Sequence, residues 1–353
     1  MGALHRIIPN TNTCHLAKRQ QRIGIVFFAC CIFFLFPSSL KAGTVQLRPL
    51  SISLEGYDYP YRVDFLPITI EGQDLRMAYM DVSPVGKGNG RSVMLLHGKN
   101  FFGAYWKETI QALVQHGYRV IVPDQIGFGK SSKPNIHYSF HLLAAATKGL
   151  LDLLAVNHVA IVGHSMGGML ATRFALMYPE VVTHLILEDS IGLEDYRTFV
   201  PYATVEELYR QEMQATPESI LRYHKGYYVH WQPQYGEYAE VAARCMLSSE
   251  YPLLAMSSAL TYQMIYEQPV CYEFANLKVK TLIIVGENDR TVVGRGRVPK
   301  ELLSRAGQYP ELGRHTAAQI PGSTLLEIPG VGHIPHFEAA DRFHEELLRF
   351  MQR

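Results

Sequence analysis

Six short, continuous apolar runs, separated by amphipathic segments of helical length, make up most of this 353-residue sequence. Strands buried on both faces are continuous apolar runs, and their alternation with helices is typical of a parallel sheet covered on both sides. The pattern predicts strands over 93–96, 119–122, 159–162, 184–187, 281–285 and 324–328, and helices over 105–116, 140–155, 166–177, 300–306 and 338–351. Upstream, alternating segments over 61–70 and 75–82 predict an antiparallel start to the sheet. We therefore expect an α/β protein with a mostly parallel, doubly wound sheet.

The stretch 193–271 interrupts this rhythm, because it contains helix-like segments and many tyrosines but no short apolar strand. It predicts a helical insertion that divides the α/β core into 43–192 and 272–353. Aromatic and methionine side chains can line an adaptable, mainly apolar pocket, and the alternative for each is plain packing of the insertion onto the core. The side chains concerned are Tyr196, Tyr202, Tyr209, Tyr223, Tyr227, Tyr228, Trp231, Tyr235, Tyr238, Tyr262, Tyr266, Met213, Met246, Met256 and Met264.

Residues 1–42 have a composition of their own, with basic residues but no acidic one. An apolar run over 23–36 follows the basic part and leads to small residues near Ala42. This order is typical of a secretory signal peptide, since a membrane-spanning helix needs about 20 apolar residues. An uncleaved anchor over 23–40 is the alternative. We therefore expect export, to the periplasm or the medium, with or without a membrane anchor.

The charge balance bears on the kind of partner, and the cysteine content bears on disulfide formation. The chain has 33 Lys and Arg against 32 Asp and Glu, which does not favour nucleic acid as a partner. Three of the five cysteines lie before residue 43, which leaves Cys245 and Cys271. In an oxidising compartment these two can form a disulfide, and the alternative is two separate buried thiols. The sequence leaves the oligomeric state open.

The sharpest motif is Gly163-His164-Ser165-Met166-Gly167-Gly168, which stands between a predicted strand and a predicted helix. This is the context of a nucleophile elbow, in which a tight, strained turn lifts a serine hydroxyl above the sheet. The glycines at 163 and 167 allow the turn. The motif therefore predicts Ser165 as a nucleophile. His164 is expected to point away from Ser165 and to serve in packing.

A serine hydroxyl needs a base, and the base needs a carboxylate that orients it. His333 follows the last predicted strand, and Asp289 follows the one before it, so both lie beyond strand ends, where open parallel sheets bind ligands. We predict a triad of Ser165, His333 and Asp289. The alternative base is His336, and the alternative acids are Glu188, Asp189 and Glu287, which also stand at strand ends.

Two backbone N–H groups are candidates for an oxyanion hole. One belongs to Met166, directly after the nucleophile. The other belongs to Lys99 in the run His97-Gly98-Lys99-Asn100, where Gly98 allows close approach of the backbone. We expect backbone donation there, with the Lys99 and Asn100 side chains as solvated surface groups.

Taken together, these motifs resemble the α/β-hydrolase fold family over about 60–192 and 272–353. In that resemblance His97 and Gly98 belong to the oxyanion loop, 124–131 is the loop after the next strand, and 193–271 sits where the family inserts a helical cap. A serine nucleophile argues against the haloalkane dehalogenase and epoxide hydrolase branches. The elbow is similar to those of esterases and monoacylglycerol lipases, whereas carbon–carbon bond hydrolases more often have Asn at the position of His164.

The expected activity is hydrolysis of a carboxylic ester with an apolar acyl or aromatic group, through an acyl-enzyme that needs no cofactor. The partner is then a small-molecule substrate. No HExxH or paired CxxC motif is present, so we predict no metal. Two alternatives stay open: a carbon–carbon bond hydrolase acting on a vinylogous diketone, and a non-catalytic binding protein on the same fold.

Overall fold

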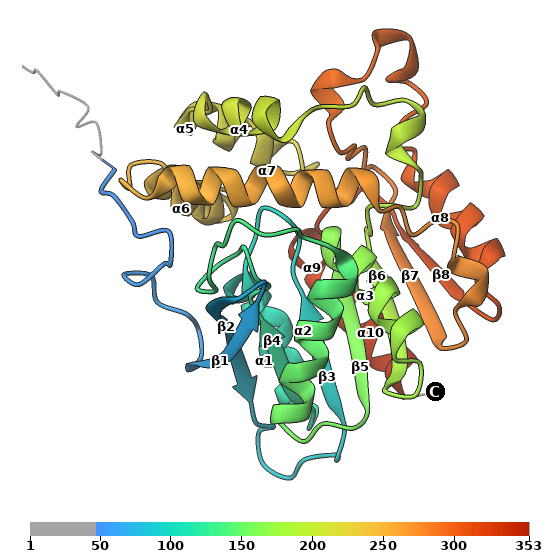
Figure 1. Cartoon of the computed structure of the whole chain (residues 1–353). Coiled ribbons are helices and arrows are strands. Elements are labelled where there is room, and N and C mark those ends of the chain that lie inside the picture. The colour runs from blue at the N-terminus through green and yellow to red at the C-terminus, as the bar shows by residue number, and fades with distance from the viewer. Residues whose placement is uncertain (1–46, 353) are drawn as a thin grey trace, which may run out of the picture. The chain divides into compact units, whose positions relative to one another are not determined.

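An eight-stranded sheet with the order β1-β2-β4-β3-β5-β6-β7-β8 organises the computed structural model, which describes residues 47–352 (Figure 1). β1 pairs with β2, and β2 with β4, in antiparallel fashion, while all other neighbours are parallel. Every predicted strand is present. The strands are β1 (Val63–Ile70), β2 (Gln73–Val82), β3 (Ser92–Leu96), β4 (Arg119–Pro123), β5 (Val159–His164), β6 (Val182–Glu188), β7 (Lys280–Gly286) and β8 (Thr324–Ile328).

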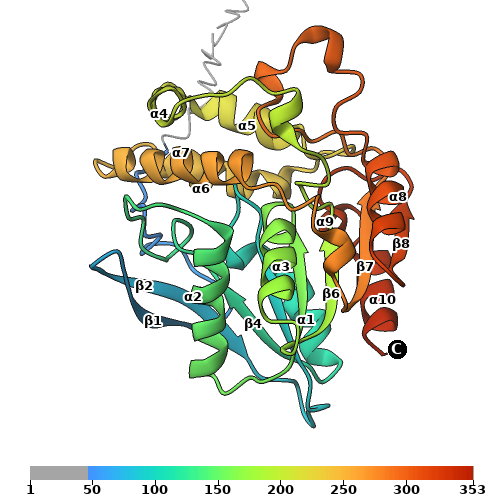
Figure 2. The ribbon, with the colours of Figure 1, turned by 45° about the vertical axis from the view of Figure 1, so that its right-hand side comes forward.

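Helices cover both faces of this sheet, as the apolar runs predicted. Alternate residues of β3 enter two different cores: Met94 and Leu96 pack with α2 (Phe140–Leu153), α3 (Met166–Met177) and α8 (Tyr309–Gln319), whereas Val93 and Leu95 pack with α1 (Lys107–Gln115) and α10 (Ala340–Met351). Successive side chains of a strand point to opposite faces, so the two cores lie on opposite sides of the sheet. In Figure 2, α2 and α3 lie in front of the strands. The fold is therefore doubly wound.

One predicted helix is absent from the structure, and another begins slightly later than predicted. The prediction over 300–306 is wrong: Lys300–Leu302 form only a short 3-10 turn, and the helix that covers β7 and β8 is α8. Gly307, at φ +66°, ends the segment, and α8 begins with Pro310 in its first turn. The predicted helix over 338–351 is present as α10, which begins two residues later because Ala339, with φ −139°, separates it from the short helix α9 (Pro335–Glu338).

Four helices lie between β6 and β7, within the stretch predicted as an insertion: α4 (Val205–Met213), α5 (Pro217–Lys225), α6 (Glu237–Cys245) and α7 (Tyr251–Glu267). Thr204 and Thr216 begin α4 and α5 with capping boxes, which satisfy otherwise unpaired N–H groups. α4 packs on α7, and α5 on α6. Both views show these helices lying across one end of the sheet (Figures 1 and 2). We refer to residues 205–267, which comprise these helices and the segments that connect them, as the cap; the division of the chain into domains stays a prediction.

The predicted leader over 1–42, with its apolar part over 23–40, lies outside the described residues. Among residues 47–352, no helix has the length and apolar character that crossing a membrane requires. Cys245 and Cys271 are separate thiols, the first buried and the second half-buried. Burial raises the pKa of the Cys245 thiol to about 11, so it is protonated at neutral pH.

Candidate active site

Ser165 stands in the sharp turn between β5 and α3, with φ 56° and ψ −120°. A positive φ is strained for any residue with a Cβ atom. Only glycine fits at positions 163 and 167 beside it. A Cβ atom on Gly163 would overlap the Gly167 carbonyl, and a Cβ atom on Gly167 would overlap the Leu96 carbonyl. The backbone of Ser165 is fixed as well, since its N–H donates to the Glu188 carbonyl at 3.1 Å. The turn has the strained geometry that the elbow motif predicted.

The three residues of the predicted triad meet at the carboxyl ends of their strands. Ser165 Oγ lies 3.0 Å from His333 Nε2, and His333 Nδ1 lies 2.7 Å from Asp289 Oδ2. The Thr291 N–H donates to the other oxygen of Asp289 at 2.8 Å. His333 and Asp289 are buried, whereas Ser165 keeps 8% of its surface exposed. This chain of bonds lets the imidazole accept the serine proton while the carboxylate holds its second nitrogen.

His336, the alternative base, is paired elsewhere. Its Nδ1 lies 2.8 Å from Glu188 Oε1, which also accepts the His336 backbone N–H at 2.8 Å. The ring stacks on Trp106 at 4.3 Å, fully buried. Burial lowers the pKa of His336 well below its usual range and raises that of Glu188 to about 7. The pair therefore belongs to the core, and neither of its side chains is hydrogen-bonded to the Ser165 hydroxyl among the described residues.

The remaining alternative acids also have other partners. Both carboxyl oxygens of Asp189 accept the Gly286 N–H, at 3.0 and 3.1 Å. Burial and the charge of Asp289 raise the pKa of Asp189 well above its usual range. Glu287 is half-buried, and its backbone forms two hydrogen bonds: its N–H donates to the Ile328 carbonyl, and its carbonyl accepts from the Arg290 guanidinium.

His164 does more than fill space. Its Nε2 lies 2.8 Å from the His333 carbonyl, and its Nδ1 lies 3.1 Å from the Tyr105 hydroxyl. Burial lowers its pKa well below the usual range, so the ring is neutral. A neutral ring has one donor and one acceptor. Since a carbonyl only accepts, Nε2 donates to His333 and Nδ1 accepts from Tyr105.

The predicted oxyanion loop lies against the nucleophile. A Cβ on Gly98 would come within 3.2 Å of Ser165 Cβ and 3.0 Å of His164 Nδ1. His97 is buried and holds the loop, because its Nδ1 donates to the Gly98 carbonyl at 2.9 Å and its Nε2 accepts the Gln125 N–H at 3.0 Å. This places the backbone next to Ser165, as the motif predicted.

The side chains after Gly98 are not the solvated surface groups that the sequence suggested. Lys99 Nζ donates to Ser258 Oγ in α7 at 2.6 Å and lies 4.0 Å from Glu212 Oε1 in α4. Asn100 Nδ2 donates to the Tyr227 hydroxyl at 2.7 Å. Burial lowers the pKa of the Lys99 ammonium. Both side chains are bound by the cap, which sequence spacing did not indicate.

One set of possible metal ligands lies among the described residues. Side-chain donor atoms of Asp189, Asp289 and His333 all lie within 4.8 Å of one another. Two of the three are already bonded, since the His333 imidazole pairs with the Asp289 carboxylate. The raised pKa of Asp189 favours its protonated form, whereas a metal ligand has to be deprotonated. The set is therefore explained by the triad and its buried acid neighbour.

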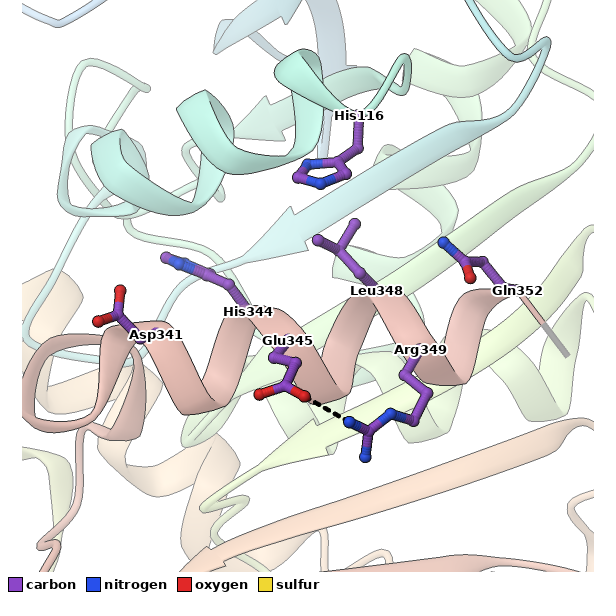
Figure 3. A pocket seen from close by; sticks show the side chains of 7 residues that line it. All are labelled: His116, Asp341, His344, Glu345, Leu348, Arg349 and Gln352. Carbon is purple, nitrogen blue, oxygen red and sulfur yellow. Dashed lines mark hydrogen bonds and ion pairs between the residues drawn. The ribbon is translucent and has the colours of Figure 1, made fainter.

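An open groove between α1 and α10 is unrelated to these residues. It is lined by His116, Asp341, His344, Glu345, Leu348, Arg349 and Gln352 (Figure 3). Arg349 turns to Glu345 on the same helix, while His344 pairs with Thr109 at 3.0 Å. No member of the triad lines this groove.

Three contributors to the site were not assigned a role from the sequence. Asp189 was predicted as an alternative triad acid, but both of its carboxyl oxygens accept the Gly286 N–H instead. Tyr227 was one of many cap aromatics, yet its ring stacks on His333 with centroids 5.1 Å apart. Glu338 bonds the N–H of Gly332, next to the base, at 2.8 Å. The sequence carried no signal that would single out Tyr227 or Glu338, because each meets a partner through the fold.

Comparison with known proteins agrees with this geometry. The family model for the alpha/beta hydrolase fold matches residues 91–340. A 2-hydroxy-6-oxononadienedioate/2-hydroxy-6-oxononatrienedioate hydrolase of Burkholderia vietnamiensis is 28% identical over 298 residues, covering 82% of this chain and 95% of that protein.

Solved structures of other proteins also share the α/β hydrolase fold with this chain. A probable hydrolytic enzyme from Pseudomonas aeruginosa PAO1 is 45% identical, with a TM-score of 0.85, covering 87% of this chain and 100% of that one. An esterase from Exiguobacterium antarcticum shares the fold, with a TM-score of 0.64 at 20% identity over 82% of this chain and 99% of that one. The chain therefore belongs to the α/β hydrolase fold family and is a hydrolase of that fold.

Proposed function

We propose that this hydrolase cleaves carboxylic esters of apolar acyl or aromatic groups through a covalent acyl-enzyme. The observation that carries the proposal is the continuous set of bonds from Ser165 through His333 to Asp289, at 3.0 and 2.7 Å. Such a set converts an unreactive hydroxyl into a nucleophile and needs no cofactor.

Each triad residue has a separate task in this mechanism. Ser165 Oγ attacks the ester carbonyl as His333 Nε2 takes its proton, and Asp289 stabilises the imidazolium that forms. The imidazolium then protonates the alkoxide that leaves, and a water activated by the same nitrogen releases the acyl group. The N–H groups of Lys99 and Met166 are the proposed donors to the oxyanion, where losing one donor costs about 3–4 kcal/mol of barrier.

The surroundings of the site support an uncharged, apolar substrate. Phe101, in the segment after the oxyanion loop, contacts Tyr227 and Tyr238 of the cap, with centroids 5.8 and 5.7 Å apart. The nearest cation of the loop, Lys99, is bound by Ser258 and faces Glu212. Aromatic walls with a few hydroxyl groups suit acyl or aryl esters.

Carbon–carbon bond hydrolysis is the second candidate, favoured by the relative from Burkholderia vietnamiensis, which aligns over 95% of its own length. That reaction places the same serine and histidine at a ketone carbonyl, but the leaving group is a carbon that must be protonated. The esterase proposal needs only an alcohol as leaving group.

A p-nitrophenyl ester series from acetate to palmitate tests the proposal, alongside a 2-hydroxy-6-oxo-dienoate. We expect hydrolysis of the esters that is lost in Ser165→Ala and retained in Ser83→Ala, a matched change at an exposed serine. The chain-length optimum then gives the length of acyl chain that the site accepts best. Turnover of the dienoate without ester hydrolysis would transfer the assignment to the second candidate. Inertness toward both, with no labelling of Ser165 by a fluorophosphonate, would contradict a catalytic role.

Export of the protein also stays a proposal, supported by the composition of residues 1–42. Cell fractionation followed by N-terminal sequencing of the protein distinguishes a cleaved leader from a retained anchor, and recovery in the cytoplasm would contradict both.

A further inference from the structure

The backbone of the base is anchored from two directions. The His333 N–H donates to the Tyr227 carbonyl in the cap at 2.7 Å, and its own carbonyl accepts from His164. The cap approaches so closely that a Cβ on Gly332 would overlap the Tyr227 carbonyl. The loop that carries the base is thus held between the elbow and the cap.

The ring of Tyr227 lies over the ring of the base. The two planes are inclined by only 26°, with centroids 5.1 Å apart. The edge of the His333 ring already bonds Asp289 at one nitrogen and Ser165 at the other. These two bonds require the imidazole to stay in one plane. The stacked ring of Tyr227 restricts rotation of the imidazole out of that plane.

The hydroxyl of the same residue reaches the other catalytic loop. It accepts from Asn100 Nδ2 at 2.7 Å, and Asn100 directly follows Lys99, whose N–H is the proposed oxyanion donor. Tyr227 is buried, and burial raises its pKa well above the usual range, so the hydroxyl stays protonated. One cap residue therefore spans the base and the oxyanion loop.

A carboxylate fastens this part of the cap to the base loop. One oxygen of Glu338 accepts the N–H groups of Val229 and His230, each at 2.9 Å, and the other accepts the Gly332 N–H at 2.8 Å. Bonds from backbone N–H groups to a carboxylate are stronger than neutral ones. Glu338 therefore ties the cap segment that carries Tyr227 to the base loop through three hydrogen bonds.

We propose that Tyr227 is a positioning residue for the reaction, holding the imidazole of His333 through its ring and the oxyanion loop through its hydroxyl. This inference rests on the proposed function. It makes the cap a part of the catalytic geometry in addition to a cover for the substrate.

Two substitutions separate the roles of ring and hydroxyl. Tyr227→Leu removes the ring but keeps the backbone carbonyl, and we expect kcat to fall about 100-fold, as for a small misplacement of a catalytic group. KM should stay within about threefold if the residue positions rather than binds. Tyr227→Phe keeps the ring and loses one hydrogen bond, so it should restore most of kcat, leaving a loss of about fivefold.

Tyr228→Phe is the matched control. Tyr228 is the next residue of the cap, it stacks on Tyr235 at 4.5 Å, and its hydroxyl has no hydrogen-bond partner within residues 47–352. Its kcat should stay within about twofold of the wild type. Asn100→Ala, alone and combined with Tyr227→Phe, provides a test that needs no large cavity: both single changes should lower kcat equally and the pair should add no further loss.

The measurements are kcat and KM on the best p-nitrophenyl ester and the rate of fluorophosphonate labelling of Ser165. Labelling should slow in proportion to kcat. A wild type that neither hydrolyses nor labels would overturn the proposed function, and this inference with it. A fully active wild type whose Tyr227→Leu variant matches Tyr228→Phe, or changes only in KM, would overturn the positioning role alone. Additive losses in the Asn100 cycle would overturn the link to the oxyanion loop.

Discussion

The described chain contains two buried histidine–carboxylate pairs, His333 with Asp289 and His336 with Glu188. The two histidines are three residues apart in the sequence. The distances within the pairs are nearly equal, 2.7 and 2.8 Å. They differ in the second ring nitrogen, which meets Ser165 in the first pair and has no hydrogen-bond partner among the described residues in the second. A buried histidine–carboxylate pair therefore acts as a base only where its second ring nitrogen faces a group that can give up a proton.

The largest expected effect separates the two histidines by activity. His333→Ala should lower kcat/KM by roughly 10⁵-fold, because the serine loses its proton acceptor. His336→Ala should stay within about tenfold per folded molecule, because His336 does not touch Ser165. Steady-state kinetics on samples of verified folded fraction measure both. Equal losses in the two variants would break the comparison.

For the free energy of unfolding we expect the opposite order, with a larger loss in His336→Ala than in His333→Ala. Removing His336 at pH 8 leaves the Glu188 carboxylate buried without its partner, which we expect to lower the free energy of unfolding by about 3–5 kcal/mol. Urea denaturation measures this, with His333→Ala as the reference variant. A smaller loss for His336→Ala than for His333→Ala would refute the structural role of the second pair.

The acid of the second pair should make stability depend on pH. Burial raises the pKa of Glu188 from 4.5 to about 7. Its contribution is therefore complete below pH 4.5 and is lost as the pH rises through 7, a change of about 3 kcal/mol. Glu188→Gln keeps the acceptor for His336 and cannot ionise, so its stability relative to the wild type should rise by that amount between pH 4.5 and 8. Parallel stability curves for the two proteins would contradict the buried, protonated acid.

The smallest effect concerns Asp189, the acid beside the first pair. Burial and the charge of Asp289 raise its pKa well above the usual range, which favours the neutral acid. Asp189→Asn replaces a neutral acid by a neutral amide that can still donate, so kcat/KM should change by no more than about threefold. Asp289→Asn, by contrast, should cost about 10⁴-fold. If both amides were equally damaging, Asp189 would share the charge of the triad.

The features that sequence reasoning recovered are those with local signals. Ser165, Gly163 and Gly167 are set by one turn, and the strands by continuous apolar runs. Asp289 and His333 could be chosen because each stands just beyond such a strand. The alternatives remained open for the same reason, since Glu188 and His336 also stand at element ends and only the fold pairs them across 148 positions.

The parts that escaped prediction depend on tertiary packing. Residues 300–306 have helix-forming side chains, but Gly307 closes the segment and α8, downstream, covers the sheet instead. The contacts of Lys99 and Asn100 with the cap join residues 159 and 127 positions apart. No pattern within either segment carries that information, because their partners are chosen by the position of the cap.

The backbone strain at Ser165 has a consequence for the evolution and engineering of this chain. A residue with a Cβ atom at φ 56° costs about 1–3 kcal/mol, whereas glycine adopts positive φ readily. Replacing the nucleophile by glycine therefore removes activity and, at the same time, relieves a cost that the folded state carries. A screen that ranks variants by melting temperature alone would favour molecules that have lost their chemistry.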